Sequence, residues 1–135
     1  MKRRVLFVCT HNAARSQMAE GSMNARYGDR YEAYSAGTGT GKLNPYAVRA
    51  MAEIGIDISG QHSKHISTFA GVEMDVLVAV CEGGTCPLFP WAKETVHRSF
   101  PDPSRLTGTD GEVMDGVRRI RDEIAAWIDE TFGAL

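Results

Sequence analysis

The stretch VLFVCTHNAARSQMAEG, residues 5–21, joins a short apolar run to a polar loop and then to a segment with helical spacing. Its apolar part is continuous and rich in β-branched residues, which is typical of a strand covered on both faces in a parallel sheet. Cys9 closes this run instead of lying inside it, and Arg15 and Ser16 stand where the helical spacing begins. The placement indicates that Cys9 has a chemical role rather than a packing role.

The composition is that of one ordinary globular domain, which we assign to residues 1–135. The formal net charge of -2, with 24% charged residues and no block of like charges, predicts neither a nucleic-acid partner nor a membrane partner. The apolar run at residues 5–8 is too short for a signal peptide. We therefore expect a cytoplasmic protein, and in that reducing compartment its three cysteines serve catalysis or metal binding rather than structural disulfides.

Strand and helix patterns alternate along the chain, which predicts an α/β fold. We expect strands at residues 4–9, 31–36, 74–81 and 95–100, helices at 15–27, 45–55 and 113–128, and a polar, irregular segment at 59–71. This order is typical of an open, mostly parallel sheet with helices on both faces, which binds ligands beyond the carboxyl ends of its strands. Cys9, Cys81 and Asp102 lie at or just after predicted strand ends, so we expect them at one edge of the sheet.

The loop CTHNAARS, from Cys9 to Ser16, has the composition of an anion site. Backbone N–H groups of such a loop and the dipole of the following helix attract a tetrahedral oxyanion, and Arg15 can bind two of its oxygens. The same field stabilises a Cys9 thiolate that can attack the bound centre. The candidate residues that bind the oxyanion and stabilise the thiolate are Thr10, His11, Asn12, Ala13, Ala14, Arg15 and Ser16.

Residues 5–21 resemble the C-x5-R-S signature of the low-molecular-weight tyrosine phosphatase superfamily, and more closely its arsenate reductase branch. The match continues over nearly the whole chain, at residues 35–37, 44–45, 55–58, 75–81, 100–103 and 119–124. The resemblance implies a three-layer α/β fold with a four-stranded parallel sheet flanked by helices. It also implies that Asp102, in the Asp-Pro pair, is the general acid.

The two further cysteines favour a reductase over a phosphatase, because a phosphatase of this kind needs only one thiol. Reduction of arsenate to arsenite takes two electrons, which a pair of thiols supplies by forming a disulfide. Gly83 and Gly84 make the link between Cys81 and Cys86 pliable enough for disulfide geometry. The resemblance implies a relay in which Cys9 attacks arsenate, Cys81 attacks Cys9 and Cys86 attacks Cys81, with thioredoxin, glutaredoxin with glutathione, or another thiol as the reductant.

Residues 103–107 after Asp102 contain no aromatic side chain, so a compact oxyanion suits the site better than an aryl ester. We therefore expect arsenate as the substrate, phosphate and sulfate as competitors, and a monomer. The alternatives are a tyrosine phosphatase and a non-catalytic thiol sensor of redox state or oxyanions, although a sensor needs no acid such as Asp102. Cys81 and Cys86 could also be packing residues or part of a zinc site, but no suitably spaced histidines accompany them.

Some relatives bind potassium beside the loop, at positions that match Asn12, Glu20 and Ser35 together with a carboxylate near residue 64. This chain has Lys64 there. Its ammonium group can replace the cation by pairing with Glu20, although a solvated lysine is an equally good interpretation. We expect no metal site, and no cofactor either, because the sequence has neither a dinucleotide-binding glycine pattern nor a Walker loop.

Overall fold

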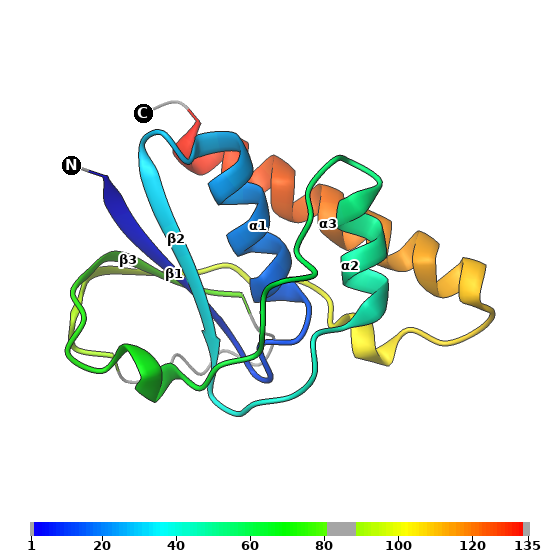
Figure 1. Ribbon diagram of the computed structural model, residues 1–135, viewed down its shortest axis with the longest axis horizontal. Coiled ribbons are helices and arrows are strands. Elements are labelled where there is room, and N and C mark those ends of the chain that lie inside the picture. Colours follow the sequence, from blue (N-terminus) through cyan, green and yellow to red (C-terminus); the bar gives the residue numbers. More distant parts are fainter. Residues whose placement is uncertain (1, 81–88, 134–135) are drawn as a thin grey trace.

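The computed structural model describes residues 2–80 and 89–133 and has the predicted alternation of strands and helices (Figure 1). The strands are β1 (Arg3–Cys9), β2 (Tyr31–Gly37), β3 (Met74–Ala79) and β4 (Ala92–His97). The α-helices are α1 (Arg15–Tyr27), α2 (Pro45–Ala52) and α3 (Asp110–Phe132), and the 3-10 helices are η1 (Ile66–Phe69) and η2 (Pro103–Arg105). No helix within the described ranges is long and apolar enough to cross a membrane.

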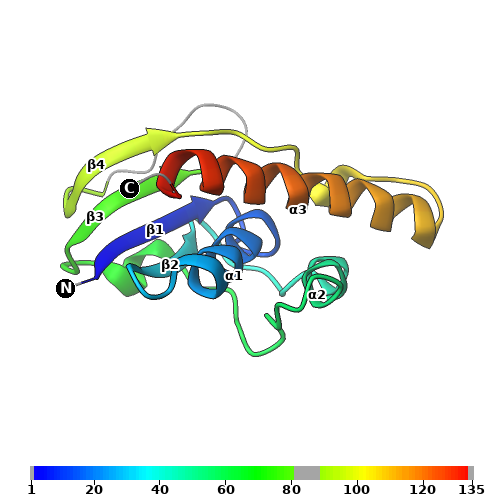
Figure 2. The ribbon, with the colours of Figure 1, turned by 90° about the horizontal axis from the view of Figure 1, so that it is seen from above.

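The four strands form one parallel sheet in the order β2-β1-β3-β4, and Figure 2 shows them side by side in this order. Strand β1 is central: its Val8 lies opposite Ala36 of β2 and Ala79 of β3. Cys9 pairs with Gly37 at the carboxyl end of β2. The predicted four-stranded parallel sheet is confirmed, and its central strand delivers Cys9 to the carboxyl edge.

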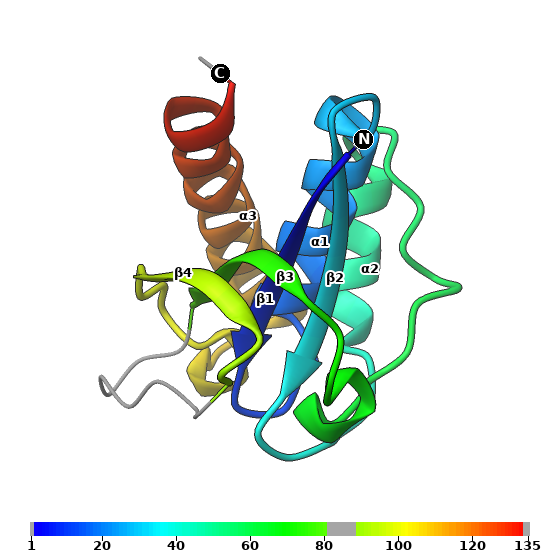
Figure 3. The same ribbon diagram turned by 90° about the vertical axis from the view of Figure 1, so that its left-hand side faces the viewer.

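Both faces of β1 are covered, which explains why residues 5–9 are all buried. Val5, Phe7 and Cys9 point into a core shared with α1, α2 and α3, while Leu6 and Val8 point into a second core on the other face. Figure 3 shows the sheet with the three α-helices behind it. Within the described residues, the second core is closed by η1 and neighbouring loop residues rather than by an α-helix.

The helix ends follow from local capping. The side chain of Asn44 accepts hydrogen bonds from the N–H groups of Tyr46 and Ala47, as expected for the cap before Pro45. Helix α2 ends at Ala52, three residues before the predicted Gly55, which has a φ of 80°. Helix α3 begins at Asp110, earlier than predicted, because a capping box that includes Thr109 starts it ahead of the apolar pattern.

The predicted strand at residues 95–100 is wrong in its bounds, since β4 runs from Ala92 to His97. Strand β4 is the edge of the sheet and most of its side chains are exposed. An exposed edge strand needs no alternation of apolar and polar residues, so the sequence carries little signal for its limits. Asp102 consequently lies five residues beyond the end of β4, at the start of η2.

Candidate active site

Cys9 is the last residue of β1, and its side chain is 2% exposed. The loop that follows is held against the end of β2, because Thr38 N–H donates to the Cys9 carbonyl and Gly39 N–H donates to that of Thr10. Gly37 permits this approach: a Cβ atom there would lie 2.5 Å from the Gly39 carbonyl oxygen. The backbone around β1 and β2 thus fixes where the thiol sits.

Two groups approach the sulfur of Cys9. The backbone N–H of Asn12 donates to Cys9 Sγ over 3.2 Å, and Ser16 Oγ lies 2.9 Å from the same sulfur. Asn12 Nδ2 donates to Ser16 Oγ over 2.7 Å, which leaves the hydroxyl proton of Ser16 free to point at Cys9. These two contacts fix the position of the sulfur at the end of β1.

Helix α1 differs from the other two α-helices at its amino end. Asn44 caps α2 and Thr109 caps α3 with their side chains, whereas Ala14 precedes α1 and, among the described residues, no side chain caps that helix. The first N–H groups of a helix need partners and attract anions. The amino end of α1 therefore offers its N–H groups to an oxyanion bound above Cys9.

Arg15 is 5% exposed, and its guanidinium group is held by residues 100–102, which are far from it in sequence. Its Nη1 donates to the Phe100 carbonyl over 3.3 Å, and its Nη2 lies 3.6 Å from Asp102 Oδ2. Asp102 Oδ1 accepts hydrogen bonds from the N–H of Ser104 at 2.9 Å and from its hydroxyl at 2.8 Å. Of the three residues predicted at one edge of the sheet, the structure brings Cys9 and Asp102 to one cavity, which Arg15 also lines, and Cys81 lies outside the described residues.

The charge state of Asp102 follows from these neighbours. Burial by itself would raise the pKa of Asp102, but the two hydrogen bonds from Ser104 and the nearby guanidinium of Arg15 outweigh it and hold that pKa below its usual value. The carboxyl group is therefore ionised at neutral pH when no anion is bound.

A cavity of about 40 Å³ lies over the sulfur. A single water needs roughly 10–15 Å³ on this scale, so the space holds about three oxygen-sized groups, comparable to a tetrahedral oxyanion. Three residues predicted to bind the oxyanion do not line this cavity: Thr10 is exposed, whereas Asn12 and Ser16 are fully buried. The residues that line the cavity are Cys9, His11, Ala13, Ala14, Arg15, Asn44, Asp102, Pro103 and Ser104.

Three of these lining residues were not predicted as site residues. Asn44 was recognised only as a helix cap, but its N–H also donates to the Ala13 carbonyl over 2.9 Å, which ties α2 to the loop. Pro103 and Ser104 follow Asp102 in sequence, and the Asp-Pro-Ser turn is the one signal that could have indicated them.

Cys81 and Cys86 lie outside the described residues. The chain reaches the carboxyl edge immediately before Cys81, because the Val80 N–H donates to the Val8 carbonyl over 2.9 Å. The Val80 carbonyl in turn accepts from the N–H of Phe100. The end of β3 therefore lies between Cys9 and the segment that leads to Asp102.

Lys64 faces Glu20 beside the loop, as the sequence suggested. Lys64 Nζ lies 4.0 Å from Glu20 Oε1, which also accepts from Ser35 Oγ over 2.5 Å, and the backbone N–H of Lys64 donates to Asn12 Oδ1. Burial raises the pKa of Glu20 and lowers the pKa of Lys64. Lys64 and Glu20 thus form a partly buried pair of opposite charges next to the loop of residues 9–16.

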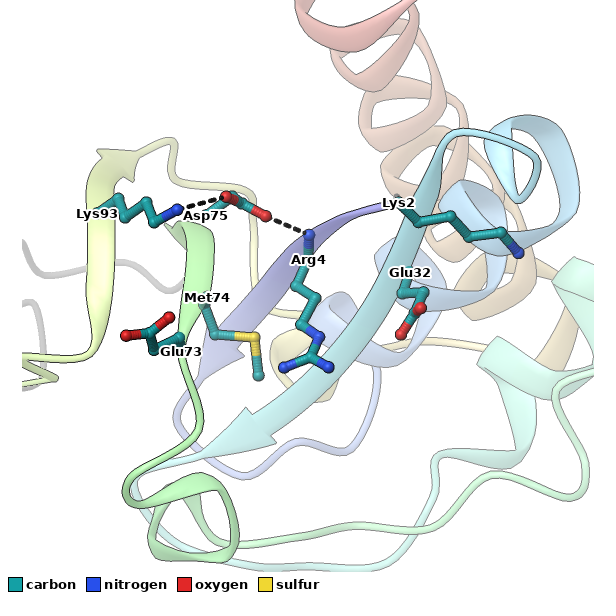
Figure 4. Close-up of a pocket in the computed structure, with 7 residues that line it drawn as sticks. All are labelled: Lys2, Arg4, Glu32, Glu73, Met74, Asp75 and Lys93. Atoms are coloured by element: carbon teal, nitrogen blue, oxygen red, sulfur yellow. Dashed lines mark hydrogen bonds and ion pairs between the residues drawn. The ribbon is translucent and has the colours of Figure 1, made fainter.

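A larger hollow, of about 370 Å³, lies at the opposite end of the sheet (Figure 4). Asp75 bridges it: Asp75 Oδ2 accepts from the backbone N–H of Arg4 over 2.7 Å, and Asp75 Oδ1 lies 3.4 Å from Lys93 Nζ. Among the described residues, its lining consists of Lys2, Arg4, Glu32, Glu73, Met74, Asp75 and Lys93. None of these described residues carries a thiol, hydroxyl or imidazole group.

Comparisons with known proteins show which proteins this chain is similar to. Residues 4–130 match the family described as low molecular weight phosphotyrosine protein phosphatase. The arsenate reductase of Halalkalibacterium halodurans is 46% identical over 125 residues, which cover 91% of this chain and 90% of that protein. The arsenate reductase of Bacillus subtilis is 41% identical over 93% of this chain and 92% of that protein. A solved arsenate reductase in the reduced state superposes with a TM-score of 0.82 at 28% identity, over 98% of both chains.

Proposed function

The chain belongs to the low molecular weight phosphotyrosine protein phosphatase family, and on this premise we propose that it reduces arsenate to arsenite with Cys9 as the nucleophile. The observation that carries the proposal is the setting of the Cys9 sulfur. It is buried, receives two hydrogen bonds, and faces a small cavity that Arg15 and the uncapped end of α1 make attractive to an oxyanion. Phosphate and sulfate, which share this shape and charge, compete with arsenate.

In the first step the Cys9 thiolate attacks arsenic, a sulfur–arsenic bond forms and one oxygen leaves. The hydrogen arsenate dianion brings negative charge close to Asp102, which raises the affinity of that carboxyl for a proton. Asp102 takes up a proton from solvent when the dianion binds and then donates it to the departing hydroxide, which leaves as water. Arg15 binds two of the remaining oxygens and balances their charge.

The electrons come from a second thiol. The Cys81 thiolate attacks Cys9 Sγ, a Cys9–Cys81 disulfide forms, and the electron pair of the sulfur–arsenic bond passes to arsenic, which leaves as arsenite. Cys86 then attacks Cys81, which releases the Cys9 thiolate and leaves a Cys81–Cys86 disulfide. This order is the one that the family resemblance implies, and the approach of Val80 to the end of β1 supports Cys81 as the thiol that attacks Cys9.

An external dithiol must return the Cys81–Cys86 disulfide to two thiols, at the cost of two electrons for each arsenite. We propose thioredoxin as that partner, with glutaredoxin plus glutathione or another thiol as the alternative. Such a cycle needs a reducing compartment, which places the reaction in the cytoplasm. We also propose that the protein works as a monomer.

The second candidate function is hydrolysis of phosphate esters, because Cys9, Arg15 and Asp102 are also the groups that a phosphatase of this family requires. Against an aryl ester, the described lining of the cavity contains no phenylalanine, tyrosine or tryptophan. A sensor without turnover explains neither the position of Asp102 nor its contact with Arg15. We therefore rank arsenate reduction above both alternatives.

The deciding experiment is a single turnover of the fully reduced protein with arsenate and no added reductant, with arsenite measured after quenching. Wild type and Cys86→Ser are expected to release about one arsenite per chain, whereas Cys81→Ser releases none. If wild type releases no arsenite but hydrolyses an aryl phosphate, and both serine variants do the same, the protein is a phosphatase and the relay is wrong.

We also propose that the site works without a metal ion, because Lys64 puts a positive charge beside Glu20 where a cation would otherwise bind. Activity is expected to stay constant when potassium chloride replaces sodium chloride at fixed ionic strength. A rise in the arsenate reduction rate with potassium would show that a cation site exists in spite of Lys64.

A further inference from the structure

Gln17 lies in the first turn of α1 and is fully buried, although its side chain is polar. Its Nε2 lies 2.9 Å from each of three oxygens: the Asn12 carbonyl, Asn12 Oδ1 and the His62 carbonyl. Its Oε1 accepts a hydrogen bond of 2.7 Å from Gln61 Nε2. An amide group has two N–H protons, so these are shared among three acceptors, two of which belong to Asn12.

Asn12 is the one described residue other than glycine with a positive φ, at 51°. Asparagine enters this left-handed region more readily than most residues, but the surrounding structure still has to hold it there. The Asn12 N–H that donates to Cys9 Sγ comes from this same backbone conformation. The direction of that N–H therefore depends on whatever fixes Asn12.

Two groups hold the oxygens of Asn12 from outside the loop. Oδ1 has a second donor, the Lys64 backbone N–H at 2.9 Å. For the backbone carbonyl of Asn12, Gln17 is the only donor within the described part of the chain. Loss of Gln17 would leave that buried carbonyl without a hydrogen bond, and the residue could regain one only by rotating its backbone.

We propose that Gln17 is a positioning residue for the reaction at Cys9: it locks Asn12 in the left-handed conformation that aims the Asn12 N–H at the sulfur. Gln17 is not among the residues that line the cavity. It acts through Asn12, and its effect is to maintain the hydrogen bond from the Asn12 N–H to the Cys9 sulfur. The inference deepens the proposed function and rests on it for the identity of the nucleophile.

The test measures the thiolate of Cys9 directly, with no arsenate present. Iodoacetamide alkylation of the reduced full chain is followed from pH 4 to pH 10 by mass spectrometry of the tryptic peptide of residues 5–15, whose one cysteine is Cys9. In Gln17→Met, which keeps the length of the side chain but has no donor, the midpoint of the profile is expected to rise by about one pH unit. Gln17→His keeps one N–H donor and is expected to fall between the two.

Asn24→Ala is the matched control for a general loss of stability. Asn24 lies on the same helix, and its side chain bonds both backbone groups of Ala33, far from the sulfur. This variant is expected to unfold at lower denaturant concentration while its alkylation midpoint stays at the wild-type value. Equal shifts in Asn24→Ala and Gln17→Met would overturn the proposal, as would an unshifted midpoint in Gln17→Met.

A second comparison uses Asn12→Gly, because glycine adopts a positive φ without support. If Gln17 acts through the conformation of Asn12, Gln17→Met shifts the midpoint less in the Asn12→Gly background than in wild type. An equal shift in both backgrounds would show that Gln17 acts by another route. Since alkylation needs no turnover, a failed arsenite assay with the expected shifts would reject only the proposed reductase, and arsenite release with unshifted midpoints would reject only the role of Gln17.

Discussion

The two ends of the sheet differ in size and in chemistry. At the amino ends of the strands the hollow measures about 370 Å³ and is lined by six charged side chains and Met74, whereas at the carboxyl ends the cavity measures about 40 Å³. The larger hollow contains acids and bases that pair with one another near solvent, as Asp75 does with Lys93. The smaller cavity is lined by the buried side chains of Cys9 and Arg15.

This difference shows why volume does not locate an active site. Exposed pairs of opposite charge are screened by water and contribute little. Donors fixed by the fold in a partly dry cavity interact strongly with an anion and need no reorganisation during the reaction. At the carboxyl end, the loop after β1 and the uncapped end of α1 supply such donors. We therefore expect substitutions there to lower turnover, and matched substitutions at the amino end to leave turnover unchanged.

The largest effect is expected from Arg15→Lys compared with Arg4→Lys. Lysine keeps the charge but not the planar pair of donors, so loss of Arg15 should reduce kcat/KM for arsenate by about 10³-fold. Arg4 lines the amino-end hollow, and its bond to Asp75 uses the backbone N–H, which lysine retains. Steady-state kinetics measures both variants, and circular dichroism checks that they are folded. An equal loss of activity in Arg4→Lys and Arg15→Lys would contradict the expected difference between the two ends of the sheet.

Asp102→Asn tests the general acid and is expected to lower kcat by about 10²-fold, because an amide cannot donate the proton that the leaving oxygen needs. The matched change is Asp75→Asn, which neutralises a carboxylate of similar exposure at the other end of β3. Asp75→Asn should keep the wild-type kcat in the same assay. Equal activity of Asp102→Asn and wild type at every pH would exclude Asp102 as the acid.

Much of the carboxyl end could be predicted from the sequence, because its signals are local. An apolar run that closes on Cys9, six residues before Arg15, defines a strand, a loop and a helix within one stretch, and Asn44 with Pro45 marks the start of α2. Strand β4 was misplaced because its exposed edge needs no apolar alternation.

Other parts of the site depend on contacts between residues far apart in sequence. Gln17 reads as an ordinary helical residue until the fold brings the His62 carbonyl, 45 residues away, within 2.9 Å of it. Ser104 reads as part of a turn, and its importance follows only from the approach of Asp102 to Arg15. Such roles are set by tertiary packing, and local sequence patterns do not contain them.

A smaller effect is expected from Ser104→Ala, which removes the hydroxyl donor to Asp102 and keeps the backbone N–H. Because that hydrogen bond lowers the pKa of Asp102, its loss raises the pKa, by less than about one unit for a single bond. The protonated acid then persists to higher pH, so the alkaline limb of the kcat profile moves upward.

The chain provides a matched control for this change. Asp57 accepts the same pair of bonds from the N–H and hydroxyl of Ser59, which lower the pKa of Asp57 on the surface. Ser59→Ala is therefore expected to leave the pH profile of activity unchanged. A shift of the same size in both serine variants would mean that the alkaline limb of the kcat profile does not reflect the ionisation of Asp102.

The smallest effect belongs to the amino end and concerns stability. The bond from the Arg4 N–H, aided by Lys93, holds the pKa of Asp75 below its usual value in the folded protein. A lowered pKa means that the carboxylate stabilises the fold above about pH 4, and that this contribution is lost as the pH falls through the folded-state pKa. Asp75→Asn should be less stable than wild type by under about 1 kcal/mol at pH 7, because the group is close to solvent. Urea unfolding at pH 7 and at pH 2.5 measures the difference, which should shrink at the lower pH. A difference that persists there would come from the shape of the side chain, whereas a loss of arsenate turnover would mean that the two ends of the sheet are coupled.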